Sequence, residues 1–362
     1  MNKYRIKVIQ SLDLFWSSSV EWRYLLQKSS ADSIFTTWEW LYTWSKYFLT
    51  SDCRLLILMV YKNNDLVGIA PFYLKNNKYG PFQMRQIEFL GTPEAGSDYL
   101  DVITLPGEEG QVSSRIYEYL FREIGSSWDM IHLRDVPSNS LFFLKFLTIF
   151  EENGKHIEVS NGSFCPVVVL PGEKETFFES LSRNRREQFR RHLKILCGSG
   201  ELHHVVRQSS DLNKDIHELK NLHRKRWEGE QIIFFKFLEE YIDRSKDEGI
   251  VQLDLLKKNH ECIAAIMHLN YNYTRYMYLF AVDKEHNNKI SVGNVFLCMC
   301  IQKAIDDKII KYDLLKGDEP YKFHFTHQGN RLLNISHYQK RIGTVLYCSN
   351  RYMKNIGKIL LR

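Results

Sequence analysis

Blocks of apolar residues separated by short polar turns run along this chain, and one arrangement of blocks occurs twice. Two apolar strands joined by a polar turn are predicted at residues 58–70 and again at 254–266. The two segments align without a gap at an offset of 196 positions (264 − 68 = 196), which places Gly68 opposite Ala264. Two β-hairpins of one design in a single chain indicate an internal duplication.

The elements predicted around the two hairpins follow the same order. An aromatic helix is expected before each hairpin, at Trp38–Phe48 and at Phe234–Tyr241, because the apolar side chains recur every three or four residues. A strand, a helix and a strand are expected after each hairpin, at 99–104, 112–124 and 129–134 and then at 276–282, 292–305 and 311–316. The pattern therefore predicts two α/β domains of the same kind in tandem.

The boundary between the two halves is predicted near residue 160. Turn-forming residues gather at 151–154 and 160–163. A short apolar strand follows at 167–170 and could cross from one half to the other. This division gives a first domain over 1–160 and a second over 161–362.

Two further helices are predicted in the second domain. One is a basic helix over 177–197, and the other is an amphipathic helix in the basic tail from Lys340 to Arg362. The tail helix is expected to dock on its own domain rather than on a membrane surface.

Composition and charge narrow the class of protein. With 44% hydrophobic and 25% charged residues, the chain has the balance of a soluble globular protein. A net charge of +6 favours an anionic ligand but is too small to indicate nucleic-acid binding. The amino terminus lacks the apolar core of a signal peptide, and no apolar run is long enough to predict a transmembrane helix.

The cysteines and histidines predict reduced thiols in the cytoplasm and no metal site. The seven cysteines are scattered along the chain and odd in number, so they do not indicate a set of disulfides. Cys298 and Cys300 would point away from each other on a helix, and His203 and His204 would face opposite sides of a strand. Neither pair could therefore hold one ion.

The start of the predicted helix at 292–305 is a candidate anion site. Ser291, Val292, Gly293 and Asn294 open this helix, and a helix amino terminus offers unpaired backbone N–H groups and the positive end of the dipole. A plain serine N-cap is the alternative interpretation.

Four polar side chains follow the predicted strand at 311–316. They are Asp318, Glu319, Tyr321 and Lys322, in the sequence Gly-Asp-Glu-Pro-Tyr-Lys. Ligands of α/β proteins bind where strands end, and a carboxylate beside a lysine can act as a general base. A solvated turn is the alternative.

Other candidates for ligand binding lie elsewhere in the chain. Arg183, Arg186, Arg190 and Lys194 form a basic helical stripe that would suit phosphates, although a solvated helix face explains it equally well. Trp227 could stack on a sugar or a base, or could lie in the core. Asp98 and Asp101 flank Tyr99 at a predicted strand start, where at least one carboxylate should be exposed.

Taken together, these motifs resemble the CelD/BcsL-type acyltransferases, bacterial members of the GNAT superfamily that are named for their association with cellulose biosynthesis. The resemblance is carried by the tandem halves, the Ser-x-Gly helix start and the strand end Asp-x-Leu-x-Gly-Asp-Glu-Pro-Tyr-Lys. The early Trp-Glu-Trp-Leu helix, the Ser-Asp-Tyr-Leu-Asp stretch at 97–101 and the Ser-Arg-Asn-Arg-Arg segment at 182–186 also fit the family.

The resemblance implies two GNAT-like domains side by side, as in the Fem-type transferases, each with a mixed and largely antiparallel sheet flanked by helices. It implies acyl-CoA, most simply acetyl-CoA, as donor. The pyrophosphate would lie at 291–294, and the pantetheine arm would lie where two neighbouring strands splay apart, with the strand ending at Gly317 as one wall.

The chemistry implied is direct attack by an amine or hydroxyl on the thioester. Asp318 or Glu319 would remove the acceptor proton, while Tyr321 and Lys322 would position the acceptor or protonate the leaving thiolate.

The acceptor implied is a sugar, a sugar nucleotide or a polysaccharide precursor. Its expected contacts are Asp98, Tyr99, Asp101, Arg183, Arg186, Arg190 and Trp227. Two alternatives are a Fem-like transferase that uses aminoacyl-tRNA and an inactive scaffold subunit of a polysaccharide-synthesis system.

Overall fold

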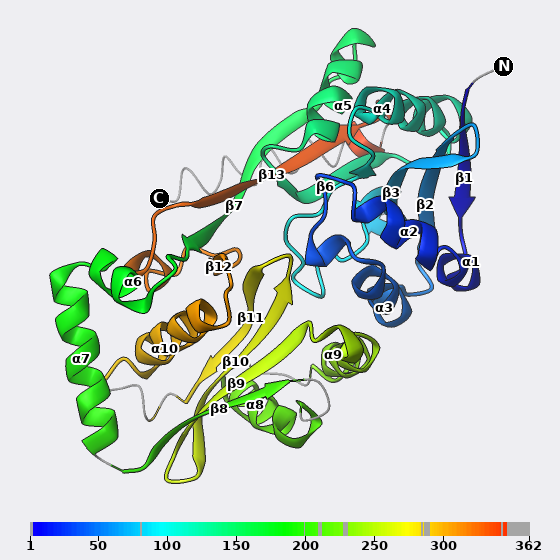
Figure 1. The fold of residues 1–362 in the computed structure, drawn as a ribbon. Coiled ribbons are helices and arrows are strands. Elements are labelled where there is room, and N and C mark those ends of the chain that lie inside the picture. The colour runs from blue at the N-terminus through cyan, green and yellow to red at the C-terminus, as the bar shows by residue number, and fades with distance from the viewer. Residues whose placement is uncertain are drawn as a thin grey trace. The chain divides into compact units, whose positions relative to one another are not determined.

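The chain forms two compact units, shown in the ribbon of Figure 1. The computed structural model describes residues 3–79, 82–198, 200–208, 212–226, 231–283, 285, 290–341 and 343–345. Unit 1 contains residues up to Gly162 together with the described residues from Arg331 onward, and unit 2 contains Ser163–Asn330. The return of the chain to unit 1 after Asn330 differs from the predicted division, which placed all of 161–362 in one domain.

Unit 1 is built on a mixed sheet whose strand order is β1-β2-β3-β4-β6-β13. The strands are β1 (Tyr4–Ile9), β2 (Cys53–Lys62), β3 (Asp65–Tyr79), β4 (Phe82–Phe89), β6 (Met130–Pro137) and β13 (Gly329–Tyr338). Among the described strand pairs of this sheet, only β4–β6 is parallel. The short strand β5 (Ile103–Thr104) pairs with β3.

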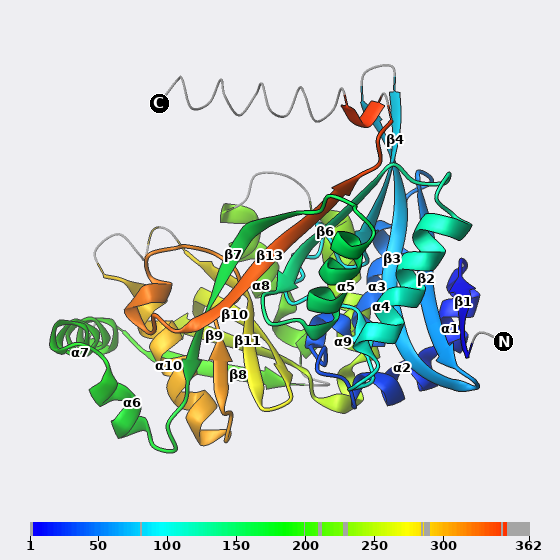
Figure 2. The ribbon, with the colours of Figure 1, turned by 90° about the horizontal axis from the view of Figure 1, so that it is seen from above.

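Helices cover both faces of the unit 1 sheet (Figure 2). They are α1 (Leu12–Ser17), α2 (Ser19–Leu26), α3 (Trp38–Phe48), α4 (Glu109–Glu118) and α5 (Leu141–Glu152), with short turns η1 (Ile34–Thr36) and η2 (Tyr119–Glu123). Helix α3 confirms the predicted aromatic face, because Trp38, Leu41 and Trp44 are all buried. Coverage on both sides explains why β2 is buried from Leu55 to Tyr61 without alternation.

Unit 2 repeats this plan. Its sheet has the order β7-β12-β11-β10-β9-β8, and β11–β12 is the one parallel pair among the strands that the structure describes. The strands are β7 (Glu158–Val169), β8 (Leu202–Gln208), β9 (Val251–Lys258), β10 (Glu261–Tyr271), β11 (Thr274–Val282) and β12 (Lys311–Asp313). The helices are α6 (Lys174–Ser180), α7 (Arg183–Gly198), α8 (Leu212–Arg226), α9 (Ile232–Arg244) and α10 (Val292–Asp306), with short turns η4 (Lys246–Glu248) and η5 (Lys322–His324).

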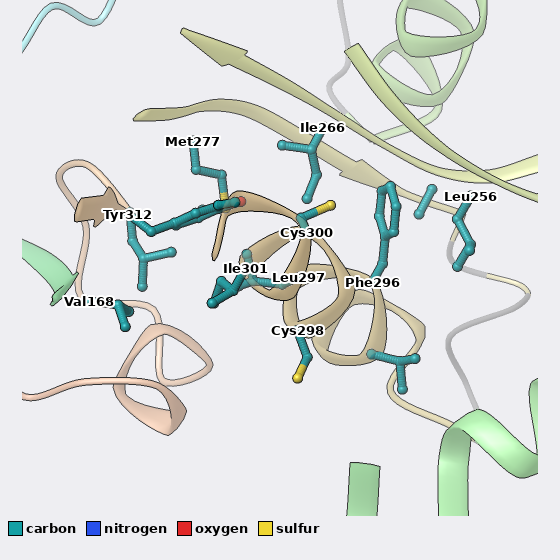
Figure 3. Packing of buried hydrophobic residues seen from close by; sticks show 14 of the residues in the cluster. Val168, Leu256, Ile266, Met277, Phe296, Leu297, Cys298, Cys300, Ile301 and Tyr312 are labelled. Atoms are coloured by element: carbon teal, nitrogen blue, oxygen red, sulfur yellow. The ribbon is translucent and has the colours of Figure 1, made fainter. Parts of the chain in front are cut away.

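Helix α10 forms the centre of the unit 2 core (Figure 3). Phe296, Leu297 and Ile301 on this helix pack in one buried cluster with Ile266 of β10 and Met277 of β11. All five side chains are 5% exposed or less, so this packing fixes α10 against the sheet immediately after the residues predicted to bind an anion. Within the described part of the chain, no helix combines the length and the apolar character needed to cross a membrane.

The pairing registers of the two hairpins agree with the predicted duplication. In the first hairpin Val60 pairs with Gly68 and Tyr61 with Leu66, so a β-bulge falls at Val67. In the second, Leu256 pairs with Ala264 and Lys257 with Cys262, so the bulge falls at Ile263. Every one of these positions is related by the same offset of 196, which a chance match of residue types would not reproduce.

Three predicted elements differ from the structure. The strand expected at 99–104 is a loop that ends in β5, and the true counterpart of β11 is β4, which pairs antiparallel with β3 and parallel with β6. The turn expected at 160–163 lies inside β7. The helix expected over 177–197 is two helices, because Leu181 is extended and buried between α6 and α7.

Two strands carry the chain from one unit to the other. Strand β7 follows α5 of unit 1, and its last residues, Val167–Val169, pair with β12 of unit 2, as the predicted crossing strand at 167–170 requires. Strand β13 follows the last turn of unit 2, and Leu332–Tyr338 pair with β6 of unit 1. The predicted tail helix is seen only at 343–345, and the rest of it lies outside the described residues.

Candidate functional site

An opening in the unit 2 sheet lies between β11 and β12. These parallel strands pair at only three positions, from Thr274 opposite Lys311 to Tyr276 opposite Asp313. Strand β12 then ends, because the Leu315 N–H donates to the Asp313 carboxylate at 2.8 Å and Leu315 takes a left-handed conformation with φ 55°. Strand β11 continues to Val282. The two strands therefore separate at their carboxyl ends, where α/β folds bind ligands.

Helix α10 begins beside this opening. Its N-cap is Ser291, whose side chain makes no capping hydrogen bond with the described residues and whose backbone N–H donates to Nδ1 of His192 at 3.2 Å. Val292 is fully buried, and its N–H donates to the Ile290 carbonyl at 2.9 Å. Residues 284 and 286–289 of the preceding loop lie outside the described part.

Gly293 allows the first turn of α10 to pack closely on β11. A Cβ atom at this position would lie 3.2 Å from Cζ of Phe280 and 3.3 Å from Cγ2 of Val282. Both distances are shorter than normal van der Waals contact. Gly293, one of the residues predicted for the anion site, thus has a packing role.

A small pocket with a cavity volume of about 30 Å³ adjoins the start of α10. It lies between α7, α10 and η5. Its polar groups come from Arg185, Gln188, His192, Ser291, Asn294 and His324. Its apolar wall comes from Leu181, Phe189, Val295, Cys298 and Phe325. The pocket therefore joins a helix amino terminus to hydrogen-bonding and basic side chains.

The two histidines of the pocket have lowered pKa values. Burial, and then the charge of Arg191, lowers the pKa of His192, and burial, followed by the charge of Arg185, lowers the pKa of His324. Both rings are therefore neutral at neutral pH. Because Nδ1 of His192 accepts from Ser291, the proton of this ring lies on Nε2; Nδ1 of His324 lies 3.2 Å from Nδ2 of Asn294.

The four residues predicted for catalysis separate into exposed and buried groups. Asp318 and Glu319 are exposed. Tyr321 is half-buried, with its ring 6.0 Å from the ring of Phe280 on β11, which places it beside the opening. Lys322 is 3% exposed, and its Nζ donates to the carbonyls of Leu315 and Lys316 at 3.2 and 2.8 Å.

Lys322 also forms an ion pair with Glu319 at 3.0 Å, so three oxygens of the loop after β12 surround its ammonium group. These contacts fix the conformation of the loop. They give Lys322 a structural role, and its predicted role toward the acceptor or the thiolate stays a prediction.

The basic stripe of α7 is partly used to hold α6. Arg186 donates to the carbonyls of Glu179 and Leu181, both at 2.7 Å, and the guanidinium of Arg190 lies 5.1 Å from the ring centre of Phe178. Arg183 is exposed and pairs with Glu187 at 2.9 Å. The apolar face of α7 packs on the core, where Leu196 is buried and Phe189 and Leu193 lie against the cluster.

The carboxylates predicted at 98 and 101 are both buried in unit 1, which corrects the expectation that one would be exposed. They lie in a loop rather than on a strand. Asp101 accepts from the Ser140 hydroxyl at 2.9 Å and from the Val102 N–H at 2.7 Å, and burial raises its pKa to about 7. Tyr99 has φ 55°, and Trp227 lies outside the described residues.

The structure thus brings Ser291, Asn294 and Tyr321 to one region of unit 2. It adds Arg185, His192 and His324, which the sequence analysis missed because they come from separate elements. It also adds a buried carboxylate at the end of β11, Asp283, which pairs with Lys225 of α8 at 2.8 Å.

Comparison with known proteins defines the class. Several solved structures cover nearly the whole chain at low sequence identity. FemX is 11% identical with a TM-score of 0.58, covering 95% of this chain and 98% of its own. A tandem GNAT protein from the clavulanic acid biosynthesis pathway is 9% identical with a TM-score of 0.50, covering 92% and 98%. These similarities confirm the predicted α/β fold with tandem GNAT-like domains.

A conserved protein of unknown function from Bacteroides thetaiotaomicron has the same fold, with 8% identity, a TM-score of 0.53 and coverage of 92% and 100%. Residues 183–323, from α7 to η5, match the family model described as acetyltransferase (GNAT) domain. Most of unit 2 therefore matches a GNAT acetyltransferase domain, which confirms the predicted enzyme class. No curated protein matches the chain.

Proposed function

We propose that the protein transfers an acyl group, most simply acetyl, from acyl-CoA to an amine or hydroxyl of a second substrate bound at the same time. The observation that carries this proposal is the separation of β11 and β12 after three residue pairs, beside the start of α10. An extended thioester arm fits an opening between two parallel strands, and an anionic group fits a helix amino terminus.

The pocket at the start of α10 supports this orientation of the donor. Gly293 and Asn294 would present backbone N–H groups to the pyrophosphate, and Arg185 would add a positive charge. The neutral His192 carries its proton on Nε2 and could donate one further hydrogen bond.

The transfer itself needs no covalent enzyme intermediate. The acceptor nitrogen or oxygen attacks the thioester carbon, the C–S bond breaks, and the thiolate takes up a proton. The backbone of β11 beyond Tyr276 would stabilise the oxyanion. Asp318 or Glu319 would accept the acceptor proton, and Tyr321, beside the opening, would position the acceptor or return a proton to the thiolate.

A sugar, sugar nucleotide or polysaccharide precursor is the acceptor that we propose. Its basis is the resemblance of the sequence to CelD/BcsL-type acyltransferases. The exposed Arg183 would meet phosphate groups of such an acceptor. A cytoplasmic location would suit both acyl-CoA and the free thiols of the six described cysteines.

The first experiment is calorimetric titration of the full chain with acetyl-CoA, using a Ser291→Asp variant. Aspartate is a better N-cap than a serine that makes no capping bond, so the variant should be at least as thermally stable as the wild type. Its negative charge would repel the pyrophosphate and should weaken binding by about tenfold or more. Gln231→Asp is the matched control, because it adds the same charge at the N-cap of α9.

Equal binding by wild type and both variants would place the donor elsewhere and refute this orientation. If the folded wild type binds no acyl-CoA, acyl-CoA-dependent transfer is refuted and aminoacyl-tRNA becomes the donor to test. If acyl-CoA binds, a double variant Asp318→Asn with Glu319→Gln that keeps full activity in cells would favour the scaffold alternative.

A further inference from the structure

Unit 2 contains a cluster of polar side chains inside its apolar core. Asp254 of β9 and His268 of β10 have side chains that are 1% and 0% exposed. Tyr312 of β12 and Cys300 of α10 are both fully buried, and the side chain of His204 on the edge strand β8 is 16% exposed. Five elements, of which β9 and β10 form one hairpin, thus bring these groups together.

The Asp254 carboxylate is the centre of the cluster. Its Oδ1 lies 2.7 Å from Nε2 of His204, and its Oδ2 lies 2.9 Å from Nδ1 of His268. The other ring nitrogen of His268 lies 2.6 Å from the Tyr312 hydroxyl. Gln252 donates to Oδ2 at 2.7 Å. His268, Tyr312 and Gln252 together hold Oδ2 in place and leave Oδ1 directed toward His204.

Cys300 completes a set of three different donor atoms. One ligand atom each from His204, Asp254 and Cys300 lies within 4.8 Å of the other two. Figure 3 shows the Cys300 sulfur on the side of α10 that faces Ile266, while the Cys298 sulfur points to the opposite side. The predicted divergence of these two cysteines is correct, but one of them meets a histidine and an aspartate from other elements.

The duplicated half shows that the fold does not require polar residues here. At the offset of 196 positions, Gln252, Asp254 and His268 correspond to Leu56, Leu58 and Phe72. These three side chains are buried in unit 1, at 6%, 0% and 1% exposure. Burying a carboxylate in a core costs about several kcal/mol of folding free energy unless its charge is compensated. Apolar residues at the same positions avoid this cost. A specific use of the carboxylate in unit 2 would explain why the polar set is present.

We propose that His204, Asp254 and Cys300 form a binding site for a divalent cation of the zinc class. Imidazole nitrogen, carboxylate oxygen and thiolate sulfur are the donors that zinc uses, whereas magnesium and calcium require oxygen ligands alone. An aspartate, a thiolate and a neutral histidine carry two negative charges, which a divalent ion neutralises inside the apolar core. His268 orients the aspartate through its second oxygen.

Loading the site requires only local changes. The Cys300 thiol loses its proton to solvent as the metal–sulfur bond forms, and His204 binds through Nε2 with its proton on Nδ1. The Nε2–Oδ1 contact opens from 2.7 Å to about 3.3 Å, the separation of two ligands on a tetrahedral ion. Three protein ligands leave the fourth position to water, on the side of the partly exposed His204.

The test is the metal content of the full chain, expressed in zinc-supplemented medium, freed of any affinity tag and desalted. Mass spectrometry of the metals should find about one zinc ion per chain. Cys300→Ser and Asp254→Asn should lose it. Cys298→Ser is the matched control, because Cys298 is equally buried on the same helix and should leave the zinc content unchanged. Circular dichroism checks that each variant is folded.

Cobalt provides a second readout that depends on Cys300 itself. The cobalt-loaded wild type and Cys298→Ser should show a thiolate-to-cobalt absorption band, and Cys300→Ser should lack it. A wild type that retains no zinc, and whose melting temperature is the same with zinc and with a chelator, would overturn the proposal. So would equal zinc retention in Cys300→Ser and the wild type. In either case the cluster would be a hydrogen-bond network alone.

Discussion

At the scale of single residues, Lys322 shows how a charged side chain can serve the backbone. Its ammonium group satisfies two carbonyl oxygens and one carboxylate within the loop that joins β12 to η5. The same loop contains Gly317 with φ 136°, a conformation that favours glycine. The shape of the loop beside the opening therefore depends on Lys322.

Replacing Lys322 by methionine should destabilise unit 2 by about 1–3 kcal/mol, because buried carbonyl groups would lose their donor. Urea unfolding of the full chain measures this loss. Lys311→Met is the control, since Lys311 is exposed on β12 and should change the free energy of unfolding by less than about 0.5 kcal/mol. An unchanged stability in Lys322→Met together with a lost activity would instead support the catalytic role.

Residue-level predictions succeeded where the function of a position follows from its local geometry. Ser291 and Asn294 could be identified because a helix start is recognisable from sequence, and both line the pocket. His192 and Asp254 could not be identified, because their partners come from other elements. The nearest ligand to Asp254 in the proposed metal site lies 46 positions away in sequence (300 − 254 = 46).

At the scale of elements, the two hairpins share a register but meet their helices differently. Gly68 faces α4 so closely that a Cβ atom there would lie 2.5 Å from Cγ1 of Val112. Its counterpart Ala264 already carries a Cβ and is fully buried. The helix that follows the hairpin therefore needs a glycine in unit 1 and not in unit 2.

Gly68→Ala should destabilise unit 1 by about 1–3 kcal/mol through overpacking. Adding Val112→Ala should recover part of that loss, because it removes the methyl groups that clash. Thermal unfolding of the single and double variants measures both effects. Gly110→Ala in α4 is the control, since nothing lies within 4 Å of its added methyl group. Additive losses in the double variant would show that the contact with Val112 is not the cause.

Elements with strong periodicity were predictable, and the exceptions have physical reasons. Helices α3, α9 and α10 and both hairpins match their predicted positions closely. Strand β4 was missed because its polar residues, including Arg85 and Glu88, obscure the apolar pattern. Arg85 pairs with Asp129 and Glu88 with Arg134, so the polar side chains of β4 are compensated within unit 1.

At the scale of the whole molecule, two strands pair in the sheet of the unit other than the one that precedes them in the chain. The end of β7 belongs to the sheet of unit 2, although β7 follows the elements of unit 1. Strand β13 pairs with β6 of unit 1, although it follows the elements of unit 2. The sequence predicted the crossing at the end of β7 but not the return of β13, because either sheet can accept an apolar strand as a pairing partner.

A substitution in one sheet should speed backbone hydrogen exchange in the strands of that sheet, even where those strands lie far away in sequence. Ile131→Ala removes a buried side chain of β6 and should speed exchange in β13 by about tenfold or more, because these strands open together. Ile266→Ala in β10 should act instead on β12 and on the end of β7. Equal acceleration throughout the chain by either variant would show that the two units unfold as one.

The return of β13 to the first sheet has a consequence for the history of the gene. Once two copies of an ancestral domain had traded their final strands, a gene split between the halves would have left each product with an open sheet edge. A single division of the chain between the halves would therefore not give two complete domains. Unit 1 would therefore be needed to complete the fold even without chemistry of its own, and it has the buried apolar residues Leu58 and Phe72 at the positions of Asp254 and His268.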